Sequence, residues 1–435
     1  METKTGPFPS LQLGLRGSLV ALPYASYLGF LGVLIVTVAA RIRAKRAALS
    51  PRVRWMLLGI TGLMVLSCTF ADSRPEAFLQ LGNFLPYFFF FAVIPLIFTR
   101  IEDWQQVATD LVITIIPINL ASVGHYWLRS PFLPAPWQQI PWIEAIRLAP
   151  HRGRAMVTFD HPNAFASYLV MILGLGLGLL VSELSQPQKI RHELTPWWKS
   201  RLFALALGTG SCLLGIFTSG SRNGLLVALI QLGAVVLMML ARANLRLVLG
   251  GLAGMFLVVG SAAMFGIGGR SLTPGDWTDD PRIATWAIAL DLIRERPWLG
   301  WGLGNFKLLF PTRTFDPVNY PKMFHPHNIW LMLATEGGLI LTLLTTLFVG
   351  YLCYRAMRLW LSRQLSPAAN GALLAYFLGF LGCLLYALFD VTLYDGRVHL
   401  LNWLILAGLY AFGEQWEPYS APSLPDDDTN AISES

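Results

Sequence analysis

The residues best suited to proton chemistry form the run His325-Pro326-His327-Asn328, directly before a long apolar stretch. Because histidine exchanges protons near neutral pH, His327 is predicted to act as a general base at the mouth of a membrane helix. His325 and Asn328 are predicted to bind substrate beside it. The alternative is an ordinary helix start, since Pro326 suits a first turn and Asn328 can cap it. A metal site lacks evident third and fourth ligands, so no metal is predicted.

Two arginines could bind an anion on the same predicted side of the membrane. Arg222 lies in the glycine-rich turn Thr218–Asn223, and Arg282 follows Pro281 at the start of a helical pattern. Ionisable groups at membrane depth are often functional, and helix N-termini favour anions. The alternatives are that Arg222 reaches lipid phosphates and that Arg282 forms a surface salt bridge with preceding aspartates. Guanidinium groups match the oxygens of a pyrophosphate.

A second polar helix opening, His161-Pro162-Asn163, contains the same residue types and follows Arg154. Helix-start chemistry alone explains Pro162, and His161 is expected to serve only that start. Two such openings on one face nevertheless indicate a shared polar cavity. Arg154 and Asn163 are predicted to bind substrate there.

Three carboxylates also lie near this face. For Asp390 and Asp395, an ion pair with an outer arginine and a catalytic role are equally open. Glu336 lies about 13 Å below His327 along a helix, too deep to share its proton. The glycines that follow it would let another helix pack closely. The glycine-rich run 300–306 lacks the strand–helix unit of a dinucleotide site, so we expect a turn that folds back on the membrane.

Composition indicates the elements that must position these residues. The chain is 54% hydrophobic and only 13% charged, and its apolar runs recur from end to end. A soluble domain carries about a quarter charged residues. The pattern predicts an all-α polytopic membrane protein. The net charge of +7 is better explained by basic cytoplasmic loops than by nucleic-acid binding.

The predicted domain organisation is an N-terminal segment (1–17), a transmembrane helical domain (18–414) and a polar cytoplasmic tail (415–435). The helical domain includes the outer segments 128–160 and 268–327, and Pro281–Arg296 within the second is predicted to be an amphipathic helix on the membrane surface. A segment around 8–20 could belong to a twelfth span. The eleven predicted spans are 18–40, 53–71, 77–98, 104–127, 161–183, 202–218, 223–241, 247–267, 328–352, 369–391 and 398–414.

Lysine and arginine set the orientation. The loops 41–54 and 184–201 are basic, as are two shorter connections around 242–246 and 355–363. All four fall on one side if the spans alternate, and that side should be cytoplasmic. The histidines and the arginines discussed above then lie on the outer side. Membrane lipids are expected binding partners of the protein.

Taken in order, several motifs resemble the O-antigen ligase and O-antigen polymerase family of membrane glycosyltransferases. The matching stretch runs from about residue 150 to 340. Similar motifs occur in cyanobacterial relatives once described as inorganic-carbon transporters. The motifs are Arg154 with Thr158–Asn163, Ser221-Arg222, Arg282 with Trp286 and Pro297–Phe306, and His327-Asn328 with Glu336-Gly337-Gly338.

The resemblance implies about twelve helices and a long periplasmic segment between late spans, in a bacterial inner membrane. It implies transfer of a glycan from an undecaprenyl-pyrophosphate carrier to an acceptor hydroxyl, without metal, nucleotide or other cofactor. The acceptor is the lipid A core in ligases, a growing glycan in polymerases and a protein in related members. The resemblance assigns His327 as the base and Arg222 and Arg282 as the pyrophosphate-binding residues.

Two other classes of function remain as alternatives. A transporter of bicarbonate or another small anion would also use arginines, but transporter sites lie near the membrane midplane between repeated halves. Here the charges gather at one face, and no repeat of the halves is visible. A structural scaffold predicts that the outer arginines are dispensable.

Overall fold

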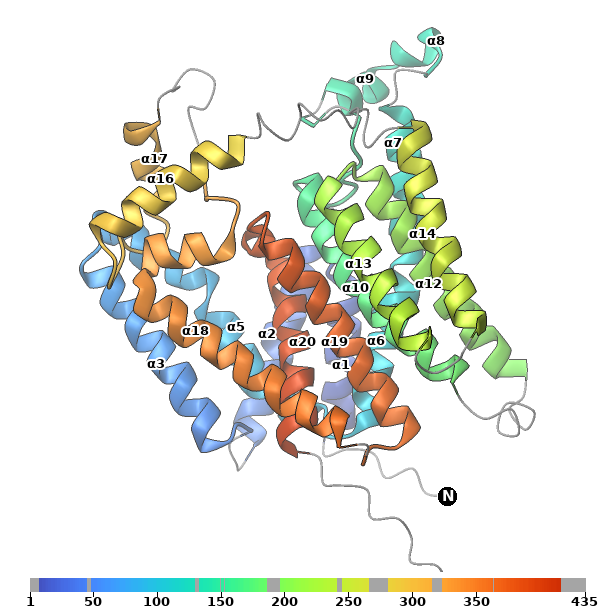
Figure 1. The fold of residues 1–435 in the computed structure, drawn as a ribbon, viewed down its shortest axis with the longest axis horizontal. Helices are drawn as coiled ribbons and strands as arrows, with labels where there is room; N and C mark the ends of the chain where they lie inside the picture. Colours follow the sequence, from blue (N-terminus) through green and yellow to red (C-terminus); the bar gives the residue numbers. More distant parts are fainter. Residues whose placement is uncertain are drawn as a thin grey trace, which may run out of the picture.

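Helices form a bundle and are the only regular structure in the described part of the chain (Figure 1). The computed structural model describes residues 8–44, 48–129, 133–148, 150–151, 153–185, 196–240, 245–265, 281–314, 323–362 and 364–415. Predictions for the tail from 416, for residues 1–7 and for parts of the two outer segments (130–132, 149, 152, 266–280 and 315–322) fall outside these residues. The predicted all-α class is confirmed.

The bounds of the helices are as follows. The first part of the chain forms α1 (Pro9–Ala21), α2 (Ser26–Arg43), α3 (Pro51–Thr69), α4 (Arg74–Gln80), η1 (Leu81–Asn83), α5 (Leu85–Ile97), α6 (Ile101–Thr114), α7 (Ile116–Leu128), α8 (Ala135–Gln138), α9 (Pro141–Leu148) and α10 (Pro162–Leu184). The second part forms α12 (Pro196–Thr218), α13 (Arg222–Leu240), α14 (Leu245–Phe265), α16 (Pro281–Glu295), α17 (Phe306–Arg313), α18 (Ile329–Leu361), α19 (Pro367–Ala387), η2 (Thr392–Tyr394) and α20 (Gly396–Gln415).

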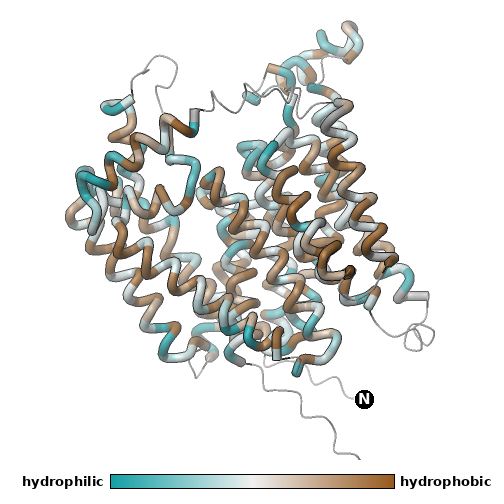
Figure 2. The backbone as a smooth tube through the Cα atoms, viewed as in Figure 1, coloured by the Kyte–Doolittle hydropathy of each residue, from teal (hydrophilic) through white to brown (hydrophobic). Residues whose placement is uncertain are grey.

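The long helices are apolar along most of their length, as their brown colour in Figure 2 shows. Among the described residues, eight helical segments are long and apolar enough to cross a membrane: α2, α4 with α5, α6 with α7, α10, α12, α13, α18 and α19. The predicted spans 53–71, 247–267 and 398–414 also form helices, namely α3, α14 and α20. The chain is thus a multi-pass membrane protein.

Three predicted spans consist of two helices rather than one, and each division lies beside a proline. The run 18–40 is divided by a turn that contains Pro23, so α1 and α2 pack as a pair and α1 continues to Ala21. The runs 77–98 and 104–127 divide just before Pro86 and Pro117. Proline has no N–H to donate to the preceding turn, which explains these breaks.

The centre of the bundle is α10, which packs most extensively against α19. A Cβ atom at Gly174 would lie 2.3 Å from the carbonyl oxygen of Leu378, so only glycine permits this close approach. The tight contact fixes the start of α10 against the end of α19. Both ends contribute side chains to the site described below.

The two predicted outer segments lie at the same end of the bundle. Figure 1 shows α8 and α9 at the upper right and α16 and α17 at the upper left. Helix α18 begins at this end beside His327 and carries Arg358 in its last turn. From Gly338, where α18 is broken, about 30 Å of continuous helix leads to Arg358, close to the hydrocarbon thickness of a membrane. The basic residues of α18 therefore lie at the opposite end from the histidines.

Helix α18 is broken near its start, and the outer segment docks into the break. Gly338 has φ 81° and ψ 169°, and a Cβ atom there would lie 2.1 Å from the carbonyl oxygen of Trp298. The N–H groups of Trp301 and Gly302 donate to the carbonyls of Thr335 and Glu336, at 2.9 and 2.8 Å. The close neighbour of Gly338 is thus the irregular outer segment and not the predicted helix. The predicted fold-back of residues 300–306 does occur.

The predicted helix Pro281–Arg296 exists as α16, and its position on a membrane surface stays a prediction. Of the apolar residues at helical spacing in this stretch, Ile283 and Leu290 are 56% and 44% exposed. The buried stripe instead contains Ile288, Ala289 and Leu292, which pack with Trp301 and other aromatic residues. Both stripes have helical spacing, so periodicity alone could not choose between them.

Candidate active site

A cavity of about 430 Å³ lies at the outer end of the bundle, where five stretches of chain meet. His325 and His327 line it together with His161, so the two polar helix openings do share one cavity. Its other lining residues come from three regions: Gln80 and Asn83 around η1, Gly304 and Lys307 at the start of α17, and Asp390, Thr392 and Tyr394 between α19 and α20.

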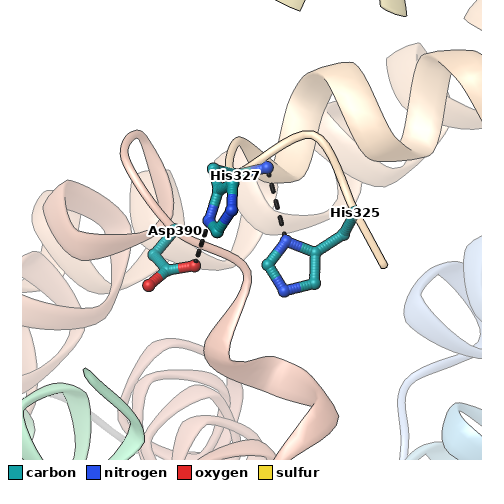
Figure 3. Close-up of side chains that lie close together, drawn as sticks. All are labelled: His325, His327 and Asp390. Carbon is teal, nitrogen blue, oxygen red and sulfur yellow. Dashed lines mark hydrogen bonds and ion pairs between the residues drawn. The ribbon is translucent and has the colours of Figure 1, made fainter. Parts of the chain in front are cut away.

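His327 is held by a carboxylate from the end of α19. Its Nδ1 lies 2.8 Å from Oδ1 of Asp390, as Figure 3 shows. The side chain of His327 is 25% exposed, whereas that of Asp390 is 5% exposed. A carboxylate on Nδ1 keeps the proton there and leaves Nε2 free to accept one. The pair therefore has the geometry of a general base and its orienting partner.

Asp390 also connects His327 to the second helix opening. Asn163 donates from Nδ2 to the other oxygen of Asp390, Oδ2, at 2.6 Å. Arg154 in turn donates from Nη2 to Oδ1 of Asn163 at 2.5 Å, and from Nε to the carbonyl of Ser219 at 2.8 Å. A continuous chain of hydrogen bonds therefore runs from Arg154 through Asn163 and Asp390 to His327.

The environment keeps Asp390 ionised and His325 neutral. Burial alone would raise the pKa of Asp390, but the hydrogen bond from His327 and the charges of the two histidines and Arg282 lower it overall. Burial lowers the pKa of His325 to about 4, against the opposing charge of Asp390. For His161, burial and then the neighbouring His151 lower the pKa to about 4. Near neutral pH, His325 and His161 are therefore uncharged.

The backbone at His327 adopts an unusual conformation, with φ 53°. Left-handed backbone is uncommon outside glycine and, at functional sites, is often held by surrounding contacts. Here the N–H of His327 donates to Nδ1 of His325 at 3.3 Å. Asn328 caps α18 by accepting from the N–H of Leu331 at 3.0 Å, and it donates to the carbonyl of Leu388 at 3.0 Å. These contacts fix the imidazole against the end of α19.

The opposite wall of the cavity carries a polar cluster that the sequence did not reveal. Lys307 forms an ion pair with Glu76 at 2.7 Å, and Gln80 donates to the same carboxylate oxygen at 2.6 Å. Asn83 then donates to Gln80 at 2.5 Å. Gln80 and Asn83 fall within the predicted apolar span 77–98, and this masked their role. Amide, ammonium and carboxylate groups of this kind suit the hydroxyls of a sugar.

The predicted arginines lie near the cavity but do not line it. Arg282 is in the first turn of α16, and its charge acts on Asp390 and Tyr386. Arg222 begins α13, directly after Ser221, whose hydroxyl is 2.8 Å from that of Tyr386. Both arginines thus lie close to the end of α19. The cavity itself is lined by the residues named above and not by these two arginines.

The other carboxylates have structural partners. Asp395 pairs with Arg397 at 2.6 Å, and the guanidinium of Arg397 lies 4.0 Å from the ring centroid of Phe159. This is the ion pair with an arginine that the sequence left open. Glu336 is fully buried, and its Oε1 accepts from the N–H of Phe306 at 3.3 Å. Glu336 therefore anchors the outer segment instead of facing His327.

Asp390 also lies where a third metal ligand would be needed, which the sequence did not show. One donor atom from each of His325, His327 and Asp390 lies within 4.8 Å of the others, so the three could hold a metal ion. Three protein ligands are the number that catalytic zinc sites use. However, Nδ1 of each histidine already has a hydrogen-bond partner. The same geometry suits either proton transfer or metal binding, because a metal-ligating histidine also carries a hydrogen bond on its other ring nitrogen.

One known protein family matches part of this chain. Residues 204–346 match the family described as O-antigen ligase, a region that contains Arg222, Arg282 and His327. Arg154 and Asp390 lie outside the matched region. Comparison with curated proteins found no match. Over residues 204–346, this chain is therefore similar to the O-antigen ligase family of glycosyltransferase-type membrane enzymes.

Proposed function

We propose that this protein transfers a glycan from an undecaprenyl-pyrophosphate carrier to an acceptor hydroxyl, at the periplasmic face of a bacterial inner membrane. The observation that carries the proposal is the pair formed by His327 and Asp390 on the cavity wall, within 2.8 Å of each other. An oriented imidazole beside a cavity at one membrane face suits a reaction between a lipid-anchored donor and a water-exposed acceptor.

In the proposed reaction, Nε2 of His327 takes the proton of the acceptor hydroxyl. The acceptor oxygen then attacks the anomeric carbon of the donor sugar. The bond from that carbon to the pyrophosphate oxygen breaks, and the electron pair leaves with the pyrophosphate. Configuration at the anomeric carbon is inverted. Asp390 holds the tautomer and stabilises the imidazolium that forms.

Arg222 and Arg282 stabilise the negative charge that grows on the departing pyrophosphate. Their place near the end of α19 supports this role, since the charge of Arg282 already acts on Asp390. Fixed cations aimed at developing charge are effective in a partly dry site. His325 and Asn328 bind substrate beside the base. Arg154 and Asn163 instead act on the base, His327, through Asp390.

The polar cluster of Lys307, Gln80 and Asn83 faces the base across the cavity and would bind sugar hydroxyls. We propose a ligase that uses the lipid A core or another glycan or protein as acceptor. A polymerase that extends a growing glycan is the alternative within the same chemistry. The location of the cavity at one end of the bundle supports either enzyme over an anion transporter, whose site would lie near the midplane.

The proposal is tested by glycan transfer in membranes supplied with a lipid-linked donor. Arg282→Ala should lower the rate by about 10²–10³, the scale of losing one such stabilising group. Arg294→Ala is the matched control, because Arg294 lies on the same helix but is exposed and pairs with Asp291. His327→Ala should also abolish most transfer. Wild-type turnover by both Arg282→Ala and His327→Ala would refute the proposal.

The proposal includes catalysis without a metal. Treatment with a strong chelator should therefore leave the transfer rate unchanged, even though His325, His327 and Asp390 could hold an ion. Loss of activity on chelation, with recovery on adding back one divalent metal, would instead assign these residues as metal ligands.

A further inference from the structure

A second notable cavity lies between α2, α3 and α5, at the end of the bundle away from the active site. Its volume is about 360 Å³, and two arginines, Arg41 and Arg54, stand in an otherwise apolar lining. The lining residues are Arg41, Ala48, Leu49, Arg54, Leu57, Leu58, Thr61, Leu85, Phe88, Phe89, Ala92, Val93 and Leu96. We propose that this groove binds one anionic glycerophospholipid from the adjacent leaflet.

The two arginines provide a place for the lipid phosphate. Arg41 is in the last turn of α2, and Arg54 is in the first turn of α3, so both lie at the same end of the bundle, on either side of the α2–α3 connection. Both side chains are exposed, and no acidic residue is among those that line the groove. Basic pockets between membrane helices at this depth bind anionic headgroups. A guanidinium pair also favours a phosphate diester over a zwitterionic headgroup, whose own cation would be repelled.

The apolar wall provides a place for the acyl chains. On α5 the lining residues run from Leu96, at the level of the arginines, to Leu85. At 1.5 Å per residue this stretch is about 16 Å long, close to half of the roughly 30 Å hydrocarbon core. The one hydroxyl along it, that of Thr61, donates to the carbonyl of Leu57 at 2.9 Å and leaves the wall apolar. The groove therefore has the depth of one leaflet, with its charge at the headgroup level.

The proposal is independent of glycan transfer and is tested by lipid binding to the full chain. The protein in detergent is titrated with phosphatidylglycerol or with phosphatidylcholine of the same acyl chains, and bound lipid is measured by native mass spectrometry. Phosphatidylglycerol should bind more tightly at one saturable site. Inorganic phosphate should not displace it, because phosphate alone cannot use the apolar wall.

Variants locate the site. Replacing both groove arginines (Arg41→Gln with Arg54→Gln) should weaken phosphatidylglycerol binding about 30-fold, from about fivefold for each charge. The control, Arg43→Gln with Arg52→Gln, removes the same charge from the same helix ends but outside the groove, and it should bind normally. Equal losses in both double variants, or none in the first, would overturn the proposal.

A third variant tests the acyl wall without changing charge. Ala92→Phe fills the groove while keeping both arginines, and it should reduce binding of phosphatidylglycerol at least tenfold. If the double arginine variant fails to fold, the Ala92→Phe variant still tests whether the groove binds phospholipid. Unchanged binding by Ala92→Phe, or equal affinity of the wild type for the two lipids, would show that the groove is not a phospholipid site.

Discussion

Helices α10 and α18 open with closely similar residues, His161-Pro162-Asn163 and His325-Pro326-His327-Asn328. In each opening, Nδ1 of the first histidine accepts from the N–H two residues later, at 3.0 Å for His161 and 3.3 Å for His325. In each, the side chain two residues later contacts Asp390. Asp390 therefore binds equivalent positions of the two openings, an amide on one side and an imidazole on the other.

The two openings differ in the side chain that contacts Asp390. One side chain can only support the carboxylate, whereas the other can also exchange a proton. An amide on a carboxylate can only fix its orientation, whereas an imidazole on the same carboxylate can also accept a proton from substrate. In α18 the cap lies three residues further along, at Asn328, so that His327 stands just before the helix. In α10 the cap is His161 itself. A repeated local structure thus serves two roles through one change of side chain.

The most severe test makes the two openings alike. His327→Asn should keep a hydrogen bond to Asp390 but lower glycan transfer by about 10²–10⁴, the usual contribution of a general base. The melting temperature should change little. His125→Asn is the control, since His125 lies near the same end but does not line the cavity. Substantial transfer by His327→Asn would show that the imidazole has no special role.

A smaller effect is expected when the shared carboxylate is replaced. Asp390→Asn should lower transfer by on the order of 10², because the tautomer of His327 is no longer fixed. Asn163→Ala breaks only the supporting side of the network and should cost about tenfold, the lower end of what losing one hydrogen bond to a charged group costs. Rates are compared in the same membranes at equal expression. A larger loss for Asn163→Ala than for Asp390→Asn would reverse the roles assigned to the openings.

The smallest effect concerns stability against pH. The pKa of His325 is lowered from 6.5 to about 4, so between these values the unfolded chain binds a proton that the folded chain does not. Stability from this residue is therefore complete above pH 6.5 and is lost as the pH falls toward 4. His325→Gln should show a shallower decline of melting temperature over this interval in detergent. Identical slopes for the two proteins would contradict the burial of His325.

The fold class was predictable because composition and apolar run length report directly on membrane helices. Their internal breaks were harder, although Pro23, Pro86 and Pro117 mark each one in the sequence. The face of α16 that packs against the rest of the protein did not follow from the sequence. Two stripes of equal periodicity compete there, and only the position of Trp301 on the neighbouring segment favours the stripe with Leu292.

The site was predictable in part. His327 stood out by its chemistry, and the two helix openings suggested a common cavity. The central role of Asp390 did not follow, because its bond to His327 spans 63 positions and depends on the approach of α10 to α19. The polar cluster around Lys307 was hidden for a similar reason, since Gln80 and Asn83 lie in a stretch that periodicity reads as apolar.

The position of Asp390 after α19 has a consequence for protein engineering. A minimal version cut at the family boundaries, residues 204–346, would keep His327, Arg222 and Arg282. It would lack the counter-charge that aligns the imidazole, and also the first opening that holds that counter-charge from behind. Chimaeras with other proteins that match this family should therefore exchange α10, α18 and α19 as one block, because His327 and the residues that hold it come from separate parts of the chain.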